Sequence, residues 1–143
     1  MLKGAGLVRA VSNSIAKKSY MAKKILIVED DAVLQKVLTE YLTSEGFEIS
    51  SALDGETGLQ MSKTINPDLI LLDIILPKKD GYEVLKEVKS DSKTKDIPII
   101  LLTNLDSISD VEKALELGAT TYLVKADYKL EEVASKIKEI LEK

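Results

Sequence analysis

The chain has 143 residues, of which 45% are hydrophobic and 31% are charged, a size and balance that suit one globular domain. It contains no cysteine and no histidine, which excludes disulfides, thiol chemistry, the usual zinc sites and a phosphohistidine on this chain. The net charge is −4, and because residues 1–20 carry +4, the remainder carries −8. We expect that a protein whose remaining residues are this acidic does not bind nucleic acid directly, since phosphate contacts need clustered lysine and arginine.

Residues 1–22 differ in character from the rest of the chain. They are basic and lack a regular apolar period, and Met21 offers a second start directly before the first strong apolar run. A targeting segment and a basic amphipathic membrane helix are alternative interpretations. We expect a disordered or non-functional leader over residues 1–22 and one folded domain over residues 23–143. Because no apolar run approaches the roughly 20 residues of a membrane span and cysteine is absent, we expect a cytoplasmic protein.

Short apolar runs recur along the predicted domain and indicate strands. Their apolar character is continuous rather than alternating, which is typical of strands covered on both faces in a parallel sheet. In chain order, the predicted strands are Ile25–Val28, a weaker one near Phe47–Ser50, Leu69–Leu72, Ile99–Leu102 and Tyr122–Val124.

Helical patterns fall between and after these strands, with apolar residues three and four positions apart. Clear examples are Leu34–Leu42, Val84–Val88 and Leu130–Leu141. Asp54 and Asp80 are predicted N-caps, and Ser109–Glu112 has the pattern of a capping box. Gly46 and Gly118 predict helix ends, because glycine tolerates the left-handed conformation there. The alternation predicts an α/β fold, a doubly wound five-stranded parallel sheet with helices on both faces.

Polar residues stand where four of the predicted strands end. They are Glu29, Asp30 and Asp31 after the first, Asp73 after the third, Thr103 after the fourth and Lys125 after the last. Because parallel strands point the same way, these residues collect at one edge, where open α/β sheets bind ligands. Any one of them alone would more often be a cap, loop or surface residue. The specific feature is that polar residues end four separate apolar runs in a consistent order.

The chemistry of this set suits a phosphoryl group. Three crowded carboxylates repel one another unless a cation lies among them, and oxygen ligands without histidine or cysteine suit magnesium or calcium. The hydroxyl of Thr103 and the ammonium of Lys125 would complete a pocket for a tetrahedral dianion. Asp73 would be the nucleophile, since carboxylates form acyl phosphates.

Five stretches carry a family resemblance. They are Ile25–Asp31, Asp68–Asp73, Leu76–Gly81, Ile100–Thr103 and Gly118–Lys125. Together they resemble the receiver domain of bacterial two-component response regulators, of the stand-alone, chemotaxis-regulator-like kind, over about residues 23–143. The resemblance implies a flavodoxin-like fold with strand order 2-1-3-4-5. It also implies a phosphoacceptor signalling protein, whose only chemistry is self-phosphorylation from small donors and self-dephosphorylation.

The resemblance implies a role for each residue of the set. Asp73 would accept a phosphoryl group from a histidine kinase or histidine phosphotransfer protein, in a reaction that depends on Mg²⁺. Asp30, Asp73 and the backbone carbonyl of Ile75 would bind the metal directly, and Glu29 would act mainly through water. Asp31 is the less favoured ligand, because the acidic pair of the family aligns with Glu29 and Asp30.

The remaining implied roles concern the phosphoryl group and the signal. Thr103 and Lys125 would bind the phosphoryl group, and Thr103 and Tyr122 would form the switch. A downstream protein would dock on the fourth helix, the fifth strand and the fifth helix. The chain would be a monomer or a weak dimer.

Two positions depart from the family pattern. Asn104 stands where a small residue is common, and Ala126 stands where proline is common. Without proline a cis peptide bond costs roughly 2.5–4 kcal/mol, so we predict a trans bond between Lys125 and Ala126.

Two other functions fit parts of the pattern. A haloacid-dehalogenase-type phosphatase also uses a strand-end aspartate with magnesium, but it needs a second aspartate where Ile75 stands. A flavodoxin-like flavin-binding protein shares the fold, but Glu29–Asp31 would repel a phosphate at its first loop.

Overall fold

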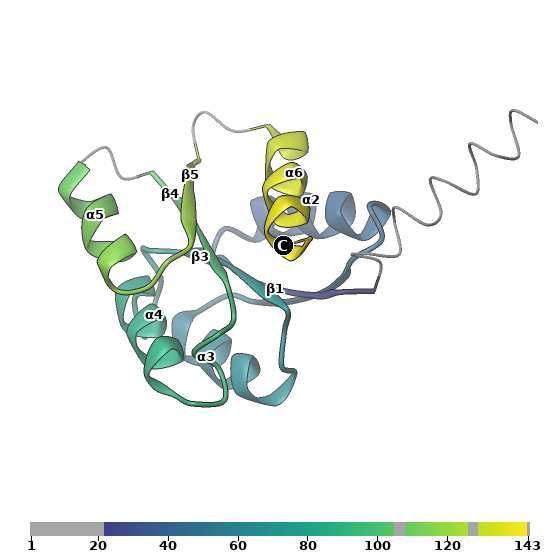
Figure 1. Ribbon diagram of the computed structural model, residues 1–143. Helices are drawn as coiled ribbons and strands as arrows, with labels where there is room; N and C mark the ends of the chain where they lie inside the picture. The colour runs from purple at the N-terminus through teal and green to yellow at the C-terminus, as the bar shows by residue number, and fades with distance from the viewer. Residues whose placement is uncertain (1–21, 105–107, 126–128, 143) are drawn as a thin grey trace, which may run out of the picture.

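The computed structural model describes residues 22–104, 108–125 and 129–142. Within them, five strands form one parallel sheet in the order β2-β1-β3-β4-β5, with helices on both faces (Figure 1). The strands are β1 Lys24–Val28, β2 Glu48–Ala52, β3 Leu69–Asp73, β4 Ile99–Thr103 and β5 Thr121–Val124. The predicted α/β fold and strand order are confirmed. The predicted leader, apart from Ala22, and the peptide bond between Lys125 and Ala126 lie outside the described residues.

The apolar sequences of the central strands explain why these strands lie in the interior of the sheet. Every residue of β3 and β4 is buried, as are Ile25–Val28 of β1, so these strands have helices on both faces. β2 lies at the edge, and its sequence of glutamate, isoleucine and serines is mostly half-buried or exposed. This explains the weak pattern near Phe47–Ser50, and the strand itself runs one to two residues later than predicted.

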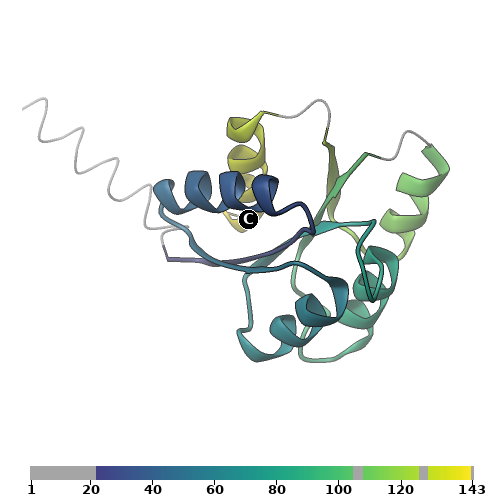
Figure 2. The ribbon, with the colours of Figure 1, turned by 180° about the vertical axis from the view of Figure 1, so that it is seen from behind.

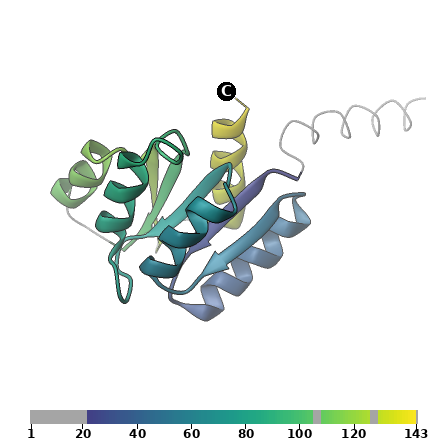
Figure 3. The same cartoon turned by 90° about the horizontal axis from the view of Figure 1, so that it is seen from below.

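Five described helices cover the two faces. They are α2 Ala32–Ser44, α3 Gly55–Thr64, α4 Gly81–Ser90, α5 Ile108–Glu116 and α6 Leu130–Leu141. Successive side chains of a strand point to opposite faces, so Ile25 and Ile27 pack in a core with α2 and α6, while Leu26 and Val28 pack with α3, α4 and α5. Figures 2 and 3 show the sheet between these two groups of helices. Within the described part of the chain, no helix combines the length and apolar character needed to cross a membrane.

Local sequence signals correctly predicted four of the helix ends. Asp54 accepts a hydrogen bond from the backbone N–H of Thr57, and Asp80 accepts one from Glu83, so both predicted N-caps are confirmed. Gly46 and Gly118 have φ of +101° and +111° at the ends of α2 and α5, also as predicted.

The predicted capping box places the start of α5 two residues too late. The helix already begins at Ile108, so Ser109 lies inside its first turn rather than at the N-cap. Serine with an acidic residue next to it also suits a first turn, where Asp110 faces the positive end of the helix dipole. The pattern therefore indicated the helix but not its first residue.

The start of α4 packs directly against the end of β3. The N–H of Gly81 donates to the carbonyl of Ile74 at 2.7 Å. A Cβ on Gly81 would lie 2.4 Å from the carbonyl oxygen of Asp73 and 2.5 Å from Cα of Ile74. Only glycine allows this approach, so the helix start sets the position of the strand end that carries Asp73.

We predict that Gly81→Ala destabilises the domain by about 1–3 kcal/mol, because the added methyl group forces apart backbone that cannot yield like a side chain. Urea unfolding of both proteins measures the change. Lys86→Ala, at an exposed position of the same helix, is the control and should stay within about 0.5 kcal/mol. Equal unfolding midpoints for the two variants would contradict the close approach.

Candidate functional site

The carboxyl edge of the sheet brings together residues from four segments. Glu29 and Asp30 follow β1, Asp73 ends β3, Thr103 ends β4 and Lys125 follows β5. The register aligns these ends, because Val28 pairs with Leu72, Asp73 with Leu102 and Thr103 with Val124.

Three of these side chains are buried. Glu29 is 0% exposed, Asp73 is 5% exposed and Thr103 is 1% exposed, whereas Asp30 is exposed to solvent. Acidic residues are almost never this buried unless they are paired. The two buried carboxylates therefore require a counter-charge inside the fold.

Lys125 supplies that counter-charge to both carboxylates. Its Nζ lies 2.5 Å from Oε1 of Glu29 and 2.9 Å from Oδ2 of Asp73. The lysine side chain is itself only 15% exposed. A single ammonium thus ties the end of β5 to the ends of β1 and β3.

Backbone N–H groups hold the other oxygen of each buried carboxylate. Oε2 of Glu29 accepts from the N–H of Asp31 at 3.0 Å, and Oδ1 of Asp73 accepts from the N–H of Ile75 at 3.3 Å. In both cases the donor lies two residues after the acid, at the start of the loop that follows the strand. Each carboxylate is therefore oriented from both sides, by lysine and by its own loop.

The pKa values follow from this crowding. Burial raises the pKa of Glu29 from 4.5 to about 7, although the Lys125 contact and the Asp31 N–H act to lower it. The nearby charge of Asp73 adds to the rise. Burial acts to lower the pKa of Lys125, but its contacts with Glu29 and Asp73 outweigh burial and raise the pKa above 10.5. Lys125 therefore stays a cation, whereas burial favours the protonated form of Glu29.

The residues present fit a divalent cation. Glu29, Asp30 and Asp73 each offer a carboxylate oxygen, and these oxygens all lie within 4.8 Å of one another. Oε1 of Glu29 is buried and, apart from its close ion pair with Lys125, has no hydrogen-bond partner among the described residues. An all-oxygen donor set that is short of positive charge suits Mg²⁺ or Ca²⁺.

Other predicted site residues take different places. Asp31 accepts from the N–H groups of Val33 and Leu34 at 3.0 and 3.1 Å, so it is the N-cap of α2 and lies outside the acidic cluster. Ile75 is 66% exposed and Tyr122 is 40% exposed, so neither side chain is packed into the site. Sequence reasoning missed the contribution of the backbone N–H groups of Asp31 and Ile75, which no side-chain pattern reveals.

The raised pKa of Glu29 predicts a pH dependence of stability in the absence of divalent metal. The folded state keeps a proton on Glu29 up to about pH 7, whereas the unfolded state loses it near pH 4.5. The free energy of unfolding should therefore fall as pH rises through this window, by on the order of 2 kcal/mol. Urea unfolding in a metal chelator at pH 5 and pH 7.5 measures this. Glu29→Gln, which cannot titrate, should lose the dependence, and the same profile in both proteins would refute the assignment.

Known proteins are similar to this chain in both sequence and fold. Residues 25–138 match the family model described as response regulator receiver domain. The chain is 40% identical over 119 residues to a probable transcriptional regulator, ycf27, of Porphyridium aerugineum, which covers 83% of this chain and 48% of that protein. The chain therefore spans about half the length of this curated relative.

Two solved structures are similar over nearly their whole length. One is the receiver domain of the sensor histidine kinase PA1611 from Pseudomonas aeruginosa PAO1, with a magnesium ion coordinated in its active-site cleft. Its TM-score is 0.78 at 30% identity, covering 85% of this chain and 99% of that chain. The other is the CheX–CheY–BeF3–Mg²⁺ complex from Borrelia burgdorferi, with a TM-score of 0.80 at 29% identity, covering 90% of this chain and 99% of that chain.

The family match extends from the first residues of β1 into the last helix, and so includes every strand end that carries the acidic cluster and its lysine. On this evidence the chain belongs to the response regulator receiver domain family.

Proposed function

We propose that this receiver domain accepts one phosphoryl group on Asp73 from a histidine kinase or a histidine phosphotransfer protein, in a magnesium-dependent reaction, and signals by docking to a downstream protein. The observation that carries the proposal is the Asp73 carboxylate. It is buried, lies 2.9 Å from the Lys125 ammonium and shares a cluster with two further carboxylates.

The phosphoryl transfer itself requires little covalent chemistry from the protein. A carboxylate oxygen of Asp73 forms a new bond to phosphorus while the bond from phosphorus to the donor histidine nitrogen breaks, and the leaving imidazole keeps that electron pair and takes up a proton. Catalysis then consists of positioning and charge neutralisation. The N–H of Ile75 on Oδ1 and the ammonium of Lys125 on Oδ2 support the positioning of Asp73.

Charge neutralisation falls to a lysine and a metal site. Lys125 would pair with one phosphoryl oxygen, and the hydroxyl of Thr103 at the end of β4 would bind another. Glu29, Asp30 and Asp73, with the backbone carbonyl of Ile75, would hold Mg²⁺. When bound, the ion supplies positive charge to the crowded carboxylates and to the incoming phosphoryl oxygens.

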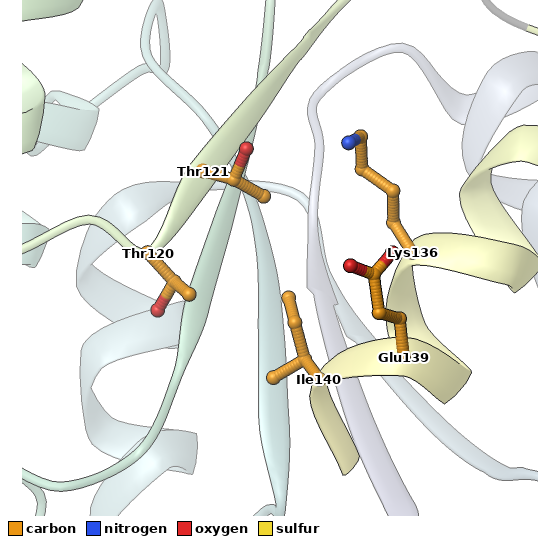
Figure 4. A pocket seen from close by; sticks show the side chains of 5 residues that line it. All are labelled: Thr120, Thr121, Lys136, Glu139 and Ile140. Carbon is orange, nitrogen blue, oxygen red and sulfur yellow. The ribbon is translucent and has the colours of Figure 1, made fainter. Parts of the chain in front are cut away.

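The proposed docking face consists of α5, β5 and α6. A pocket of about 130 Å³ lies between β5 and α6 and is lined by Thr120, Thr121, Lys136, Glu139 and Ile140. Figure 4 shows Lys136 and Glu139 of α6 across from Thr121 of β5. Tyr122 on β5 is 40% exposed, which leaves it room to change rotamer when Asp73 is phosphorylated. This mixture of charged and hydroxyl groups suits a partner that presents both donors and acceptors.

Membership of the receiver domain family argues against the two alternative functions, a haloacid-dehalogenase-type phosphatase and a flavin-binding protein. Action as a stand-alone protein, a cytoplasmic location, a monomeric or weakly dimeric state and the absence of direct nucleic-acid binding stay predictions.

Incubation with a small phosphodonor and Mg²⁺ should add one phosphoryl group, stable to acid and labile to base, because an acyl phosphate forms on Asp73. Intact-protein mass spectrometry with peptide mapping measures it. Asp73→Asn should abolish the addition. Asp96→Asn, an exposed aspartate in the loop before β4, is the matched control and should label like the native protein. Undiminished labelling of Asp73→Asn would remove the central claim.

Millimolar Mg²⁺ should raise the melting temperature by several degrees, because a ligand that binds only the folded state stabilises it by mass action, by about 2.7 kcal/mol at a hundredfold excess over Kd. Thermal melting with Mg²⁺ and with a chelator measures the shift. Asp30→Asn removes an exposed carboxylate of the cluster and should reduce it. The metal site would be disproved by a native protein whose melting temperature does not move and whose titration shows no binding.

A further inference from the structure

Gln35 of α2 makes contacts that its sequence context does not suggest. It is the fourth residue of the helix, between Leu34 and Lys36, and is half-buried. Its side-chain Nε2 donates to the carbonyl of Ala52 at 3.0 Å and to the carbonyl of Glu29 at 3.3 Å. A side-chain amide has two N–H groups, and here each is directed at a backbone carbonyl oxygen at the end of a different strand.

These carbonyls lie where the sheet stops. Ala52 is the last residue of β2, and Glu29 is the first residue after β1. The N–H of Glu29 also donates to the carbonyl of Ala52, at 3.1 Å. This backbone bond continues the pairing of β1 with β2 one residue beyond Val28 and Ala52, where the ladder ends, and the side chain of Gln35 bridges the two carbonyls at that point.

The same helix turn closes a ring of hydrogen bonds around Asp30. The backbone N–H of Gln35 donates to the carbonyl of Asp31 at 2.9 Å, and the N–H of Asp31 donates to Oε2 of Glu29 at 3.0 Å. With the side-chain bond from Gln35 to Glu29, both neighbours of Asp30 are anchored to one residue. The Asp30 carboxylate is exposed, so its position relative to Glu29 and Asp73 depends on the backbone that carries it.

We propose that Gln35 is a positioning residue of the phosphoryl site, which holds the backbone of Glu29 and Asp30 so that their carboxylates meet that of Asp73. The inference rests on the proposed function, since it assigns Gln35 to the same metal and phosphoryl site. Gln35 touches neither the metal nor the phosphoryl group and acts through Glu29. Groups that orient ligands in this way commonly contribute 10–100-fold to metal affinity.

The test uses the full chain and compares variants that differ in their donors. Gln35→Met keeps the length and removes both N–H groups, and should weaken Mg²⁺ binding by about tenfold or more. Gln35→Asn keeps the amide but is one methylene shorter and cannot reach both carbonyls, so it should also weaken binding. Gln35→Arg keeps two donors on a long side chain and should restore most of the affinity. Gln60→Met, an exposed glutamine on α3, is the matched control.

Three measurements separate positioning from a merely structural role. Titration with Mg²⁺ alone gives the affinity, amide hydrogen exchange of Glu29 in the metal-free protein reports the strand end, and thermal melting gives the stability. The expected result is weaker binding and faster exchange at Glu29 in Gln35→Met, with recovery in Gln35→Arg. If Gln35→Met does not fold, Gln35→Asn answers the same question.

The outcomes also distinguish the inference from the proposed function. Native Mg²⁺ affinity in both Gln35→Met and Gln35→Asn would overturn the inference and leave the proposed function intact, even if melting temperatures fell. Equal losses in Gln35→Arg and Gln35→Met would likewise overturn it, because the donors would then not matter. A native protein that binds no Mg²⁺ would overturn both.

Discussion

The ion pair of Lys125 with two buried carboxylates is the interaction on which the carboxyl edge of this sheet depends. Burying Glu29 and Asp73 is unfavourable unless each charge is compensated, and the lysine follows β5, which lies on the far side of β4 from β3. Its side chain therefore reaches across a strand to join the ends of β1 and β3. One ammonium is shared by two carboxylates, and burial, together with the nearby charge of Asp73, raises the pKa of Glu29 to about 7. In the proposed function, Mg²⁺ would add positive charge to this cluster of carboxylates.

The geometry of the site comes from the way helices begin. Oxygens of Glu29 and Asp73 are each held by an N–H two residues further along the chain, before α2 and α4 start. Gly81 lets the start of α4 approach the carbonyl of Asp73, and Gln35 fastens the first turns of α2 to the end of β1. Rigid helices packed on a buried sheet thus hold the loops that carry the acids.

The lysine also connects the site to the proposed docking face. The backbone N–H of Lys125, one residue beyond the last pair Thr103–Val124, donates to the carbonyl of Thr103 at 2.7 Å and joins the ends of β4 and β5. In the proposed function, a phosphoryl group on Asp73 offers new anionic partners to the Lys125 ammonium and the Thr103 hydroxyl. A shift of either residue acts directly on β5, which carries Tyr122 and lies between α5 and α6 in that face.

The sequence by itself determined the features that follow from local patterns of residues and from the common direction of parallel strands. The central strands followed from continuous apolar runs, the caps at Asp54 and Asp80 from hydrogen bonds that span three residues, and the acidic cluster from the positions at which the strands end. The tertiary structure decided the sharing of Lys125 between two acids, the close approach at Gly81 and the reach of Gln35 to Ala52. Those contacts join groups that lie far apart in the sequence or depend on ångström-scale backbone packing, and no local pattern of residue types encodes such distances.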